Sequence, residues 1–424
     1  MKPAMICLII LVMSSLPLYG AATLSLEEAL ETARDNHPQV VEARENLHGA
    51  EARTGLALAS YYPQISVAAD WSKGRSFLTA LESIRPTEMN ITALYLKQTI
   101  YDFGRTAGSV EAARSYREAT DKALAVTRQE LALRVKTAFY LLLVADKQTV
   151  AVMETVKARE HVFRQAQEFF TQGIRAKVDV ARAEANLFSA RTALIRAENN
   201  KRIAMVELAN AMGIASLEGR SPVEPAQVAV TLPERNQAQQ DAVKNRSEMH
   251  QLAALKSAAD SSLKTAKGSY LPVFSGTASA GYADRDFPPS GNVWAVGLNL
   301  TVPLFSGFSS VEQVREANAN RNAIEARQNN LKLQIGKQVE AAWFGVSEAT
   351  ARMASTEKEV AAANESKTLA EGRYQEGVGS IIEVTDAQSR ALEARTANIQ
   401  ATYDYYTALA LFDHATGYIV GSRQ

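Results

Sequence analysis

Two stretches of this chain, "FFTQGIRAKVDV" at residues 169–180 and "RYQEGVGSIIEV" at residues 373–384, share one pattern at an offset of 204 residues. In each stretch a glycine interrupts a long tract rich in Ala, Glu, Gln and Arg, and an aliphatic residue, an acidic residue and a valine follow. The similarity continues downstream, where "ARTA" recurs at the same offset. Internal repeats fix an architecture before any single element is assigned, so the sequence predicts a structural unit that occurs twice.

The interrupting glycines predict turns between pairs of long antiparallel helices. Gly173 and Gly377 suit the left-handed backbone conformation with which helices often end. The acidic residues that follow them, Asp179 and Glu383, would lie in the first turns of the return helices, where a negative charge is favourable. The predicted long helices span residues 105–170 and 309–374, and the predicted return helices span residues 178–212 and 382–416.

The first long helix carries the pattern of a coiled coil. From Leu131 to Phe170, alternate steps of four and three residues meet twelve positions, of which ten are apolar. The two exceptions are Thr149 and Arg159. A seam of this period indicates that the helix packs lengthwise against other long helices. The second long helix has a looser seam, and the many alanines in both helices allow close approach.

Each half of the chain also predicts a pair of β-strands. A helical stretch (26–59 in the first half) ends at the proline of "SYYPQ" (60–64) and again at that of "SYLPV" (269–273), because proline removes a backbone donor. After each proline the hydrophobic period changes from that of a helix to that of a strand. In "VWAVGLNLTV", Trp294, Val296 and Leu298 share one face. The predicted strands span residues 64–72, 91–102, 273–283 and 292–303.

These strands have two interpretations. About 9–11 residues suffice for a tilted strand to cross a bilayer, and apolar-out, polar-in alternation is typical of a transmembrane barrel wall. The alternative is a half-buried strand pair in a soluble sheet. If the strands lie in lipid, four of them cannot close a barrel, and open sheet edges are not tolerated there. The chain would then have to form an oligomer.

The N-terminus and the composition restrict the possible functions. Lys2, an uncharged stretch over residues 5–18 and the small residues of "YGAAT" predict a secretory signal peptide over residues 1–22. The only cysteine, Cys7, lies inside this segment, so we expect no disulfide and no thiol chemistry in the mature chain. The formal net charge is zero, which argues against nucleic acid as a partner. A connector over residues 214–240 separates the predicted repeats, 23–213 and 241–420.

No sequence motif indicates catalysis. The five histidines are isolated and lack the spacing of metal ligands. The segment "GVGS" at residues 377–380 lacks the lysine and the preceding strand of a phosphate-binding loop. We therefore expect that the protein is not an enzyme and needs neither a cofactor nor a metal.

The order helix, strand pair, long helix, glycine turn and return helix, present twice, resembles the TolC-like outer membrane efflux protein family. The resemblance covers essentially the whole mature chain and rests also on "YDFG" (101–104) and "LFSG" (304–307). It implies an α+β membrane protein whose homotrimer forms a twelve-stranded β-barrel in outer membrane lipid, continued by an α-helical barrel in the periplasm. It also implies docking to a periplasmic adaptor protein and an inner-membrane transporter.

The resemblance implies a passive function in transport. The expected protein is the outer membrane exit channel of a tripartite efflux pump, extending into the periplasm. The exit channel of a type I protein-secretion system has the same fold and stays open as an alternative. A third interpretation, from a different class, is a periplasmic coiled-coil scaffold without a pore, which gives no reason for a lipid-facing row of apolar side chains.

The resemblance also implies two groups of functional residues. The adaptor would contact the two helix turns, at Gly173, Ile174, Arg175, Gly377, Val378 and Gly379. The pore constriction and its closed state would involve Asp179, Tyr374, Glu383 and Asp386. In a symmetric trimer Glu383 and Asp386 would form two carboxylate rings that attract cations. The sequence departs from the family at Gly379, where an arginine of the closed-state lock would stand, and Arg175 is no obvious substitute.

Overall fold

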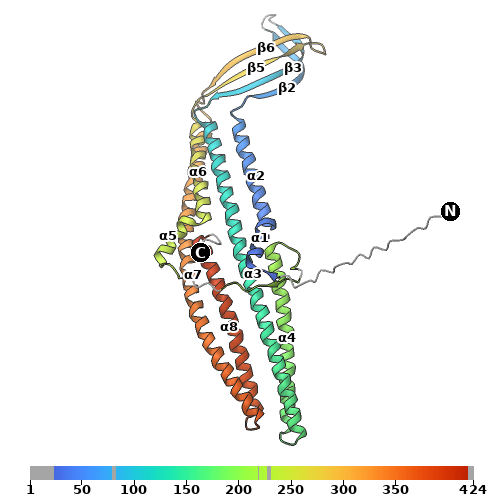
Figure 1. Ribbon diagram of the computed structural model, residues 1–424. Coiled ribbons are helices and arrows are strands. Elements are labelled where there is room, and N and C mark those ends of the chain that lie inside the picture. The colour runs from blue at the N-terminus through green and yellow to red at the C-terminus, as the bar shows by residue number, and fades with distance from the viewer. Residues whose placement is uncertain (1–22, 79–82, 218, 227–230, 419–424) are drawn as a thin grey trace, which may run out of the picture. The chain divides into compact units, whose positions relative to one another are not determined.

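The computed structural model describes residues 23–78, 83–217, 219–226 and 231–418 (Figure 1). The predicted signal peptide lies outside the described residues, as do residues 79–82, residues 218 and 227–230 of the connector, and residues 419–424. The chain divides into two compact units. The "turn unit" comprises the described residues up to Ala33 together with Arg134–Val230 and Met353–Asp404, and the "sheet unit" comprises the rest.

The two halves of the chain contain helices of the same lengths, namely 11, 22, 67 and 36 residues. The first half consists of β1 (Thr23–Leu24), α1 (Leu26–Asn36), α2 (Pro38–Ala59), β2 (Gln64–Leu78), β3 (Ser83–Tyr101), α3 (Arg105–Thr171) and α4 (Lys177–Met212). The short β4 (Ser221–Pro222) then precedes α5 (Arg235–Asn245), α6 (Ser247–Gly268), β5 (Val273–Asp284), β6 (Gly291–Thr301), α7 (Ser309–Gln375) and α8 (Ile381–Thr416). No helix of this described part is long and apolar enough to cross a membrane.

The predicted first helical stretch is interrupted at His37. This residue has an extended backbone, with φ −65° and ψ 129°, and its Nδ1 atom accepts a hydrogen bond from the backbone N–H of Gln39. Pro38 occupies the first turn of α2, where a missing backbone donor costs nothing and a fixed φ is suitable. In the second half Arg246 separates α5 from α6 with nearly the same backbone angles. The periodicity alone did not predict these breaks, because it continues through them.

The sheet unit contains a four-stranded antiparallel sheet in the order β2-β3-β5-β6. Its register places Val67, Leu94, Ala280 and Trp294 opposite one another across the four strands. Residues that oppose each other point to the same face of a sheet, so the apolar rows predicted for separate strands form one continuous apolar face. That face is uncovered: the exposed fraction is 75% for Trp294 and 76% for Val296.

The opposite face of this sheet is small or polar. Aligned positions across the strands are Ser66, Tyr95, Ser279 and Ala295, followed by Gln64, Lys97, Thr277 and Gly297. Within the described residues, β2 and β6 each pair with a neighbour on one side only. The sheet is therefore amphipathic and has two open edges.

The first hairpin is longer than the alternation predicts. The sequence predicts a connection over residues 72–90, whereas the paired strands continue until Leu78 stands opposite Ser83. Most of the added pairs contain at least one polar residue, and the Nζ atom of Lys73 lies 2.9 Å from a carboxylate oxygen of Glu88 on the facing strand. Backbone pairing does not require apolar alternation, so the hydrophobic period ends before the ladder does.

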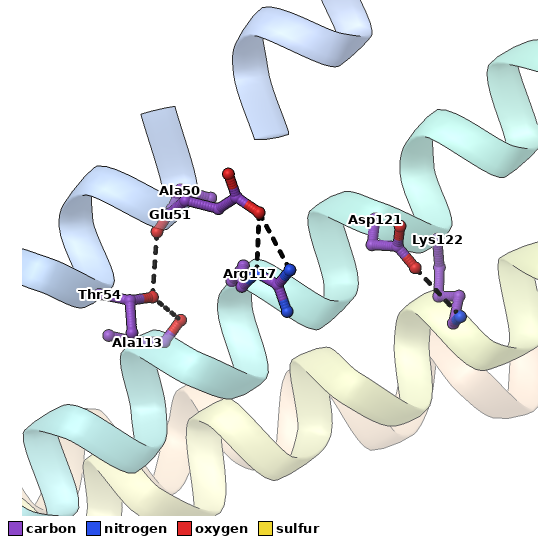
Figure 2. A network of polar contacts seen from close by, with 7 residues as sticks. All are labelled: Ala50, Glu51, Thr54, Ala113, Arg117, Asp121 and Lys122. Carbon is purple, nitrogen blue, oxygen red and sulfur yellow. Dashed lines mark hydrogen bonds and ion pairs between the residues drawn. The ribbon is translucent and has the colours of Figure 1, made fainter. Parts of the chain in front are cut away.

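Polar contacts fix α2 against the first turns of α3 in the sheet unit, as Figure 2 shows. A guanidinium nitrogen of Arg117 lies 2.9 Å from the Glu51 carboxylate, and the Thr54 hydroxyl donates to the carbonyls of Ala50 at 3.1 Å and Ala113 at 3.4 Å. The ion pair is exposed, and such pairs contribute only about 0–1 kcal/mol. These contacts set the register of the two helices more than they stabilise the fold.

A buried charged group lies where α5 meets α6. The guanidinium of Arg246 donates to the carboxylate of Glu248 and to the amide oxygen of Gln338. His414, near the end of α8, interacts electrostatically with this pair. Burial lowers the pKa of His414 below its ordinary value, the charge of Arg246 lowers it further, and Glu248 and Glu130 oppose the shift.

Acid is expected to destabilise the fold through His414. Its pKa is lower in the folded chain than the ordinary value of 6.5, so the unfolded chain binds the proton more readily. The free energy of unfolding therefore falls as the pH falls through 6.5 towards the lower folded pKa. Melting temperatures above and below this range, for the native protein and for His414→Gln, measure the effect. An equal loss in both proteins would contradict it.

Candidate functional site at the helix turns

Both helix turns of the turn unit end in the same backbone motif. Gly173, between α3 and α4, has φ 73°, and Gly377, between α7 and α8, has φ 76°. The N–H of Gly173 donates to the Phe170 carbonyl at 3.0 Å, and that of Ile174 donates to the Phe169 carbonyl at 2.9 Å. This pair of bonds defines a Schellman motif, which satisfies carbonyls at a helix end. The equivalent bonds close the second turn, so the left-handed conformation predicted for both glycines is confirmed.

Close backbone contact requires a glycine at position 379. Its N–H donates to the Arg373 carbonyl at 2.8 Å. A Cβ atom added there would lie 2.8 Å from the backbone nitrogen of Tyr374 and 2.9 Å from the carbonyl carbon of Arg373. Separations below 3.0 Å between a Cβ atom and backbone atoms force the backbone to move. This turn therefore excludes an arginine at position 379, which explains the departure noted in the sequence.

Arg175 bridges the two turns. Its Nη2 atom donates to the carbonyl oxygen of Gly377 at 2.9 Å and to that of Gly379 at 2.6 Å. Its guanidinium carbon also lies 5.8 Å from the centroid of the Tyr374 ring. The sequence-based view that Arg175 is no obvious substitute overlooked this contact. The sequence did contain a signal for it. The first repeat has Arg175 two residues after its turn glycine, and the second repeat has Gly379 at the equivalent position.

Tyr374 fills the space between the two helix pairs. It is 1% exposed and packs edge-on against Phe169 with 5.7 Å between ring centroids. Burial raises the pKa of its hydroxyl, the charge of Asp179 raises it further, and Arg175 opposes the shift. No other described residue forms a hydrogen bond with the hydroxyl. Tyr374 belongs to a buried apolar cluster, whose other members are Val162, Ala166, Ala183, Ala370, Ile381, Val384 and Ala387.

The two acidic residues of the predicted constriction each have an arginine partner. A carboxylate oxygen of Glu383 lies 3.2 Å from the Nε atom of Arg373, and one of Asp386 lies 3.2 Å from a guanidinium nitrogen of Arg390. Both carboxylates are more than 40% exposed. The sequence predicted two acidic groups one helical turn apart, and the structure shows an arginine side chain paired with each of them.

Sequence reasoning missed Arg159 as part of this site. Its side chain is buried in the turn unit and its Nη2 atom donates to the Thr385 carbonyl at 3.0 Å and to the Ser389 hydroxyl at 2.8 Å. Burial lowers its pKa, and Glu371 opposes that shift. A first-repeat helix thereby holds the first turns of α8 beside Asp386. The available signal was that Arg159 is the only charged residue on a largely apolar heptad seam.

The described residues contain no group of three or more His, Cys, Asp or Glu side chains that could hold a metal ion. The turns are instead built from ion pairs, backbone hydrogen bonds and a packed apolar cluster. Such a site can hold two helix pairs together and present loops to a protein partner.

Comparison with known proteins agrees with this architecture. The family model for outer membrane efflux proteins matches residues 29–214 and 238–418, and the chain belongs to this family. It is a family of efflux channels and not of enzymes. The chain is therefore an outer membrane exit channel of the TolC type.

Individual relatives are distant but cover most of the chain. Protein CyaE of Bordetella pertussis is 25% identical over 89% of this chain and 80% of its own length. Outer membrane protein TolC of Salmonella enteritidis is 23% identical over 93% and 83%. Alkaline protease secretion protein AprF of Pseudomonas aeruginosa is 23% identical over 92% and 84%. The crystal structure of the Campylobacter jejuni CmeC outer membrane channel has a TM-score of 0.82 at 17% identity, covering 92% of this chain and 85% of that chain.

Proposed function

We propose that this exit channel works as a homotrimer that receives substrates from a periplasmic adaptor and an inner-membrane transporter. It would conduct them passively across the outer membrane, with its long helices in the periplasm. The observation that carries the proposal is the four-stranded sheet with one uncovered apolar face and two open edges. Lipid would cover the apolar face, and the edges would pair between copies, because open edges are not tolerated in lipid.

The number of copies follows from what a channel requires. Two copies supply eight strands, whose interior is just filled by side chains, whereas three supply twelve and leave an open lumen. The small and polar face of the sheet would line that lumen. This arrangement also disfavours the scaffold without a pore, which leaves the apolar face unexplained.

Disulfide trapping tests the trimer. Cysteine at Ser66 on β2, combined with cysteine in turn at each lumen-facing position of β6, is expected to give a cross-linked trimer for at least one pair. The only native cysteine is Cys7, within the predicted signal peptide, so the background is low. Exclusively monomeric protein in isolated outer membranes would overturn the proposal.

We assign adaptor docking to the two turns, at Gly173, Ile174, Arg175, Gly377, Val378 and Gly379. Ile174 and Val378 expose apolar side chains there, which suits contact with a protein partner. The constriction is assigned to Asp179, Tyr374, Glu383 and Asp386. The support for both assignments is the family membership and the placement of these residues in one unit.

A charge at Gly377 is expected to impair adaptor docking while the trimer stays intact. The position has a left-handed backbone with open space around it, so glutamate there meets no neighbouring atom and adds a charge to the docking loop, although any side chain at this φ strains the backbone. Gly377→Gln is the matched control, since glutamine has the same size and carries the same backbone strain at this φ but adds no charge. Adaptor pull-down and drug susceptibility measure the effect. Normal export by Gly377→Glu would refute this role of the loop.

Export of proteins by a type I secretion system is the second candidate function. The observation that favours it is the similarity to AprF, whose name describes secretion of alkaline protease. Deletion of the gene separates the two functions: loss of drug resistance supports the efflux pump, and loss of a secreted protein supports secretion.

A further inference from the structure

The end of the β2–β3 hairpin extends beyond the rest of the sheet. Pairing of β3 with β5 ends where Asn90 stands opposite Asp284, whereas pairing of β2 with β3 continues to Leu78 and Ser83. The chain enters β2 from α2 and leaves β3 into α3 at one end of the sheet. The two-stranded ribbon lies at the other end. If the helices occupy the periplasm, the ribbon lies on the side of the outer leaflet. The inference below rests on that proposed placement.

Along β2 one face changes from apolar to aromatic to basic. Alternation along the strand places Val67, Trp71, Lys73 and Arg75 on the same face as the uncovered apolar surface. These four side chains are exposed, at 71% for Val67 and 64% for Trp71. At about 3.3 Å per residue, Lys73 and Arg75 lie about 7 Å and about 13 Å beyond Trp71. The basic residues therefore follow directly on the edge of the apolar surface.

A single carboxylate fixes two of these side chains next to each other. Glu88, on the facing strand, accepts a hydrogen bond from the indole N–H of Trp71 at 3.2 Å and one from the Lys73 ammonium at 2.9 Å. Lys73 and Arg75 carry two positive charges against the single negative charge of Glu88. Among these three side chains one net positive charge remains, and Arg75 lies two residues beyond Lys73 on the same face of β2.

We propose that Trp71, Lys73 and Arg75 form a binding site for the phosphate group of an outer-leaflet glycolipid. Tryptophan is suited to the boundary between acyl chains and headgroups, and basic side chains just beyond that boundary attract anionic headgroups. Arginine binds phosphate through two parallel hydrogen bonds. A lipid is the occupant, and not free phosphate, because the basic pair continues an apolar face that acyl chains would cover.

Native mass spectrometry of the purified full-length protein in detergent tests the site. The probes are diphosphorylated lipid A, its dephosphorylated form and inorganic phosphate. Lys73→Gln combined with Arg75→Gln is expected to reduce bound lipid A about tenfold. Lys97→Gln, which removes a charge from the opposite face of the sheet, is the matched control and should bind as the native protein does.

Glu88→Gln provides a test with the opposite sign. It removes the negative charge beside Lys73 and is expected to increase lipid A binding several-fold, an outcome that misfolding cannot mimic. Equal binding of phosphorylated and dephosphorylated lipid A would overturn the proposal, as would competition by inorganic phosphate at equal concentration. If the variants still form trimers and channels in these cases, only the lipid site fails and the proposed function stands.

Discussion

Replacement of Arg175 by alanine is expected to raise the open probability of the channel. The substitution removes the hydrogen bonds that join the first turn to the carbonyls of Gly377 and Gly379, together with the contact over the Tyr374 ring. Hydrogen bonds of a charged donor contribute about 1.5–3 kcal/mol each, and partial exposure reduces this figure. We therefore expect the ratio of open to closed channel to increase about tenfold.

Single-channel recording in planar bilayers measures this change, and sensitivity of cells to a large antibiotic reports it in vivo. Arg175→Lys should be intermediate, because an ammonium lacks the planar fork of a guanidinium. Arg182→Ala, which removes an exposed arginine from the first turns of α4, just after the turn that contains Arg175, should leave the channel closed. Native gating in a correctly folded Arg175→Ala trimer would show that the bridge does not hold the closed state.

Removal of two other arginines is expected to change ion selectivity. Glu383 and Asp386 are paired with Arg373 and Arg390 within one chain, so the constriction proposed at these residues should distinguish cations from anions only weakly in the native channel. Arg373→Gln with Arg390→Gln leaves the carboxylates unpaired in every copy of the proposed trimer. Two unit charges about 4 Å apart interact by about 1 kcal/mol even in water, and we expect the cation preference to rise about tenfold.

The reversal potential across a salt gradient measures this preference. Further addition of Glu383→Gln and Asp386→Asn removes the unpaired carboxylates and should return the selectivity to nearly its native value. A native channel that already prefers cations strongly would mean that the arginines point away from the lumen. Unchanged selectivity in the arginine variant would place the constriction elsewhere on the chain.

Local signals predicted most of the secondary structure. The turns at Gly173 and Gly377 were visible because only a few residues suit a left-handed helix end. The long helices begin and end within a few residues of the predicted positions, because the 3.6-residue period continues until a glycine or proline ends it. The strands followed from the change to a period of 2. Beyond Trp71 the period of 2 ends but the backbone pairing of β2 and β3 continues, so the predicted strands were shorter than the observed ones.

The candidate site could be predicted only in part. Both turns and the acidic residues Glu383 and Asp386 were identified from the sequence, with the family resemblance supplying their expected roles. Arg175 was predicted only as part of the docking turn, and the bridging contacts of Arg159 and Arg175 were not predicted, because each arginine contacts backbone atoms more than 200 residues away. Every residue has a backbone carbonyl, so the residue type at a position does not indicate that its carbonyl accepts such a hydrogen bond.

The sequence by itself determined the order of elements, the two glycine turns and the amphipathic strands, because these depend on the conformational preferences and period of neighbouring residues. Only the tertiary structure decided how the turns are joined. Close packing of Gly379 against the backbone of Arg373 and Tyr374 leaves no room for a side chain. The charged group that joins the turns therefore comes from Arg175 on the other turn. This depends on how two segments that are distant in sequence pack together, which the sequence pattern does not show.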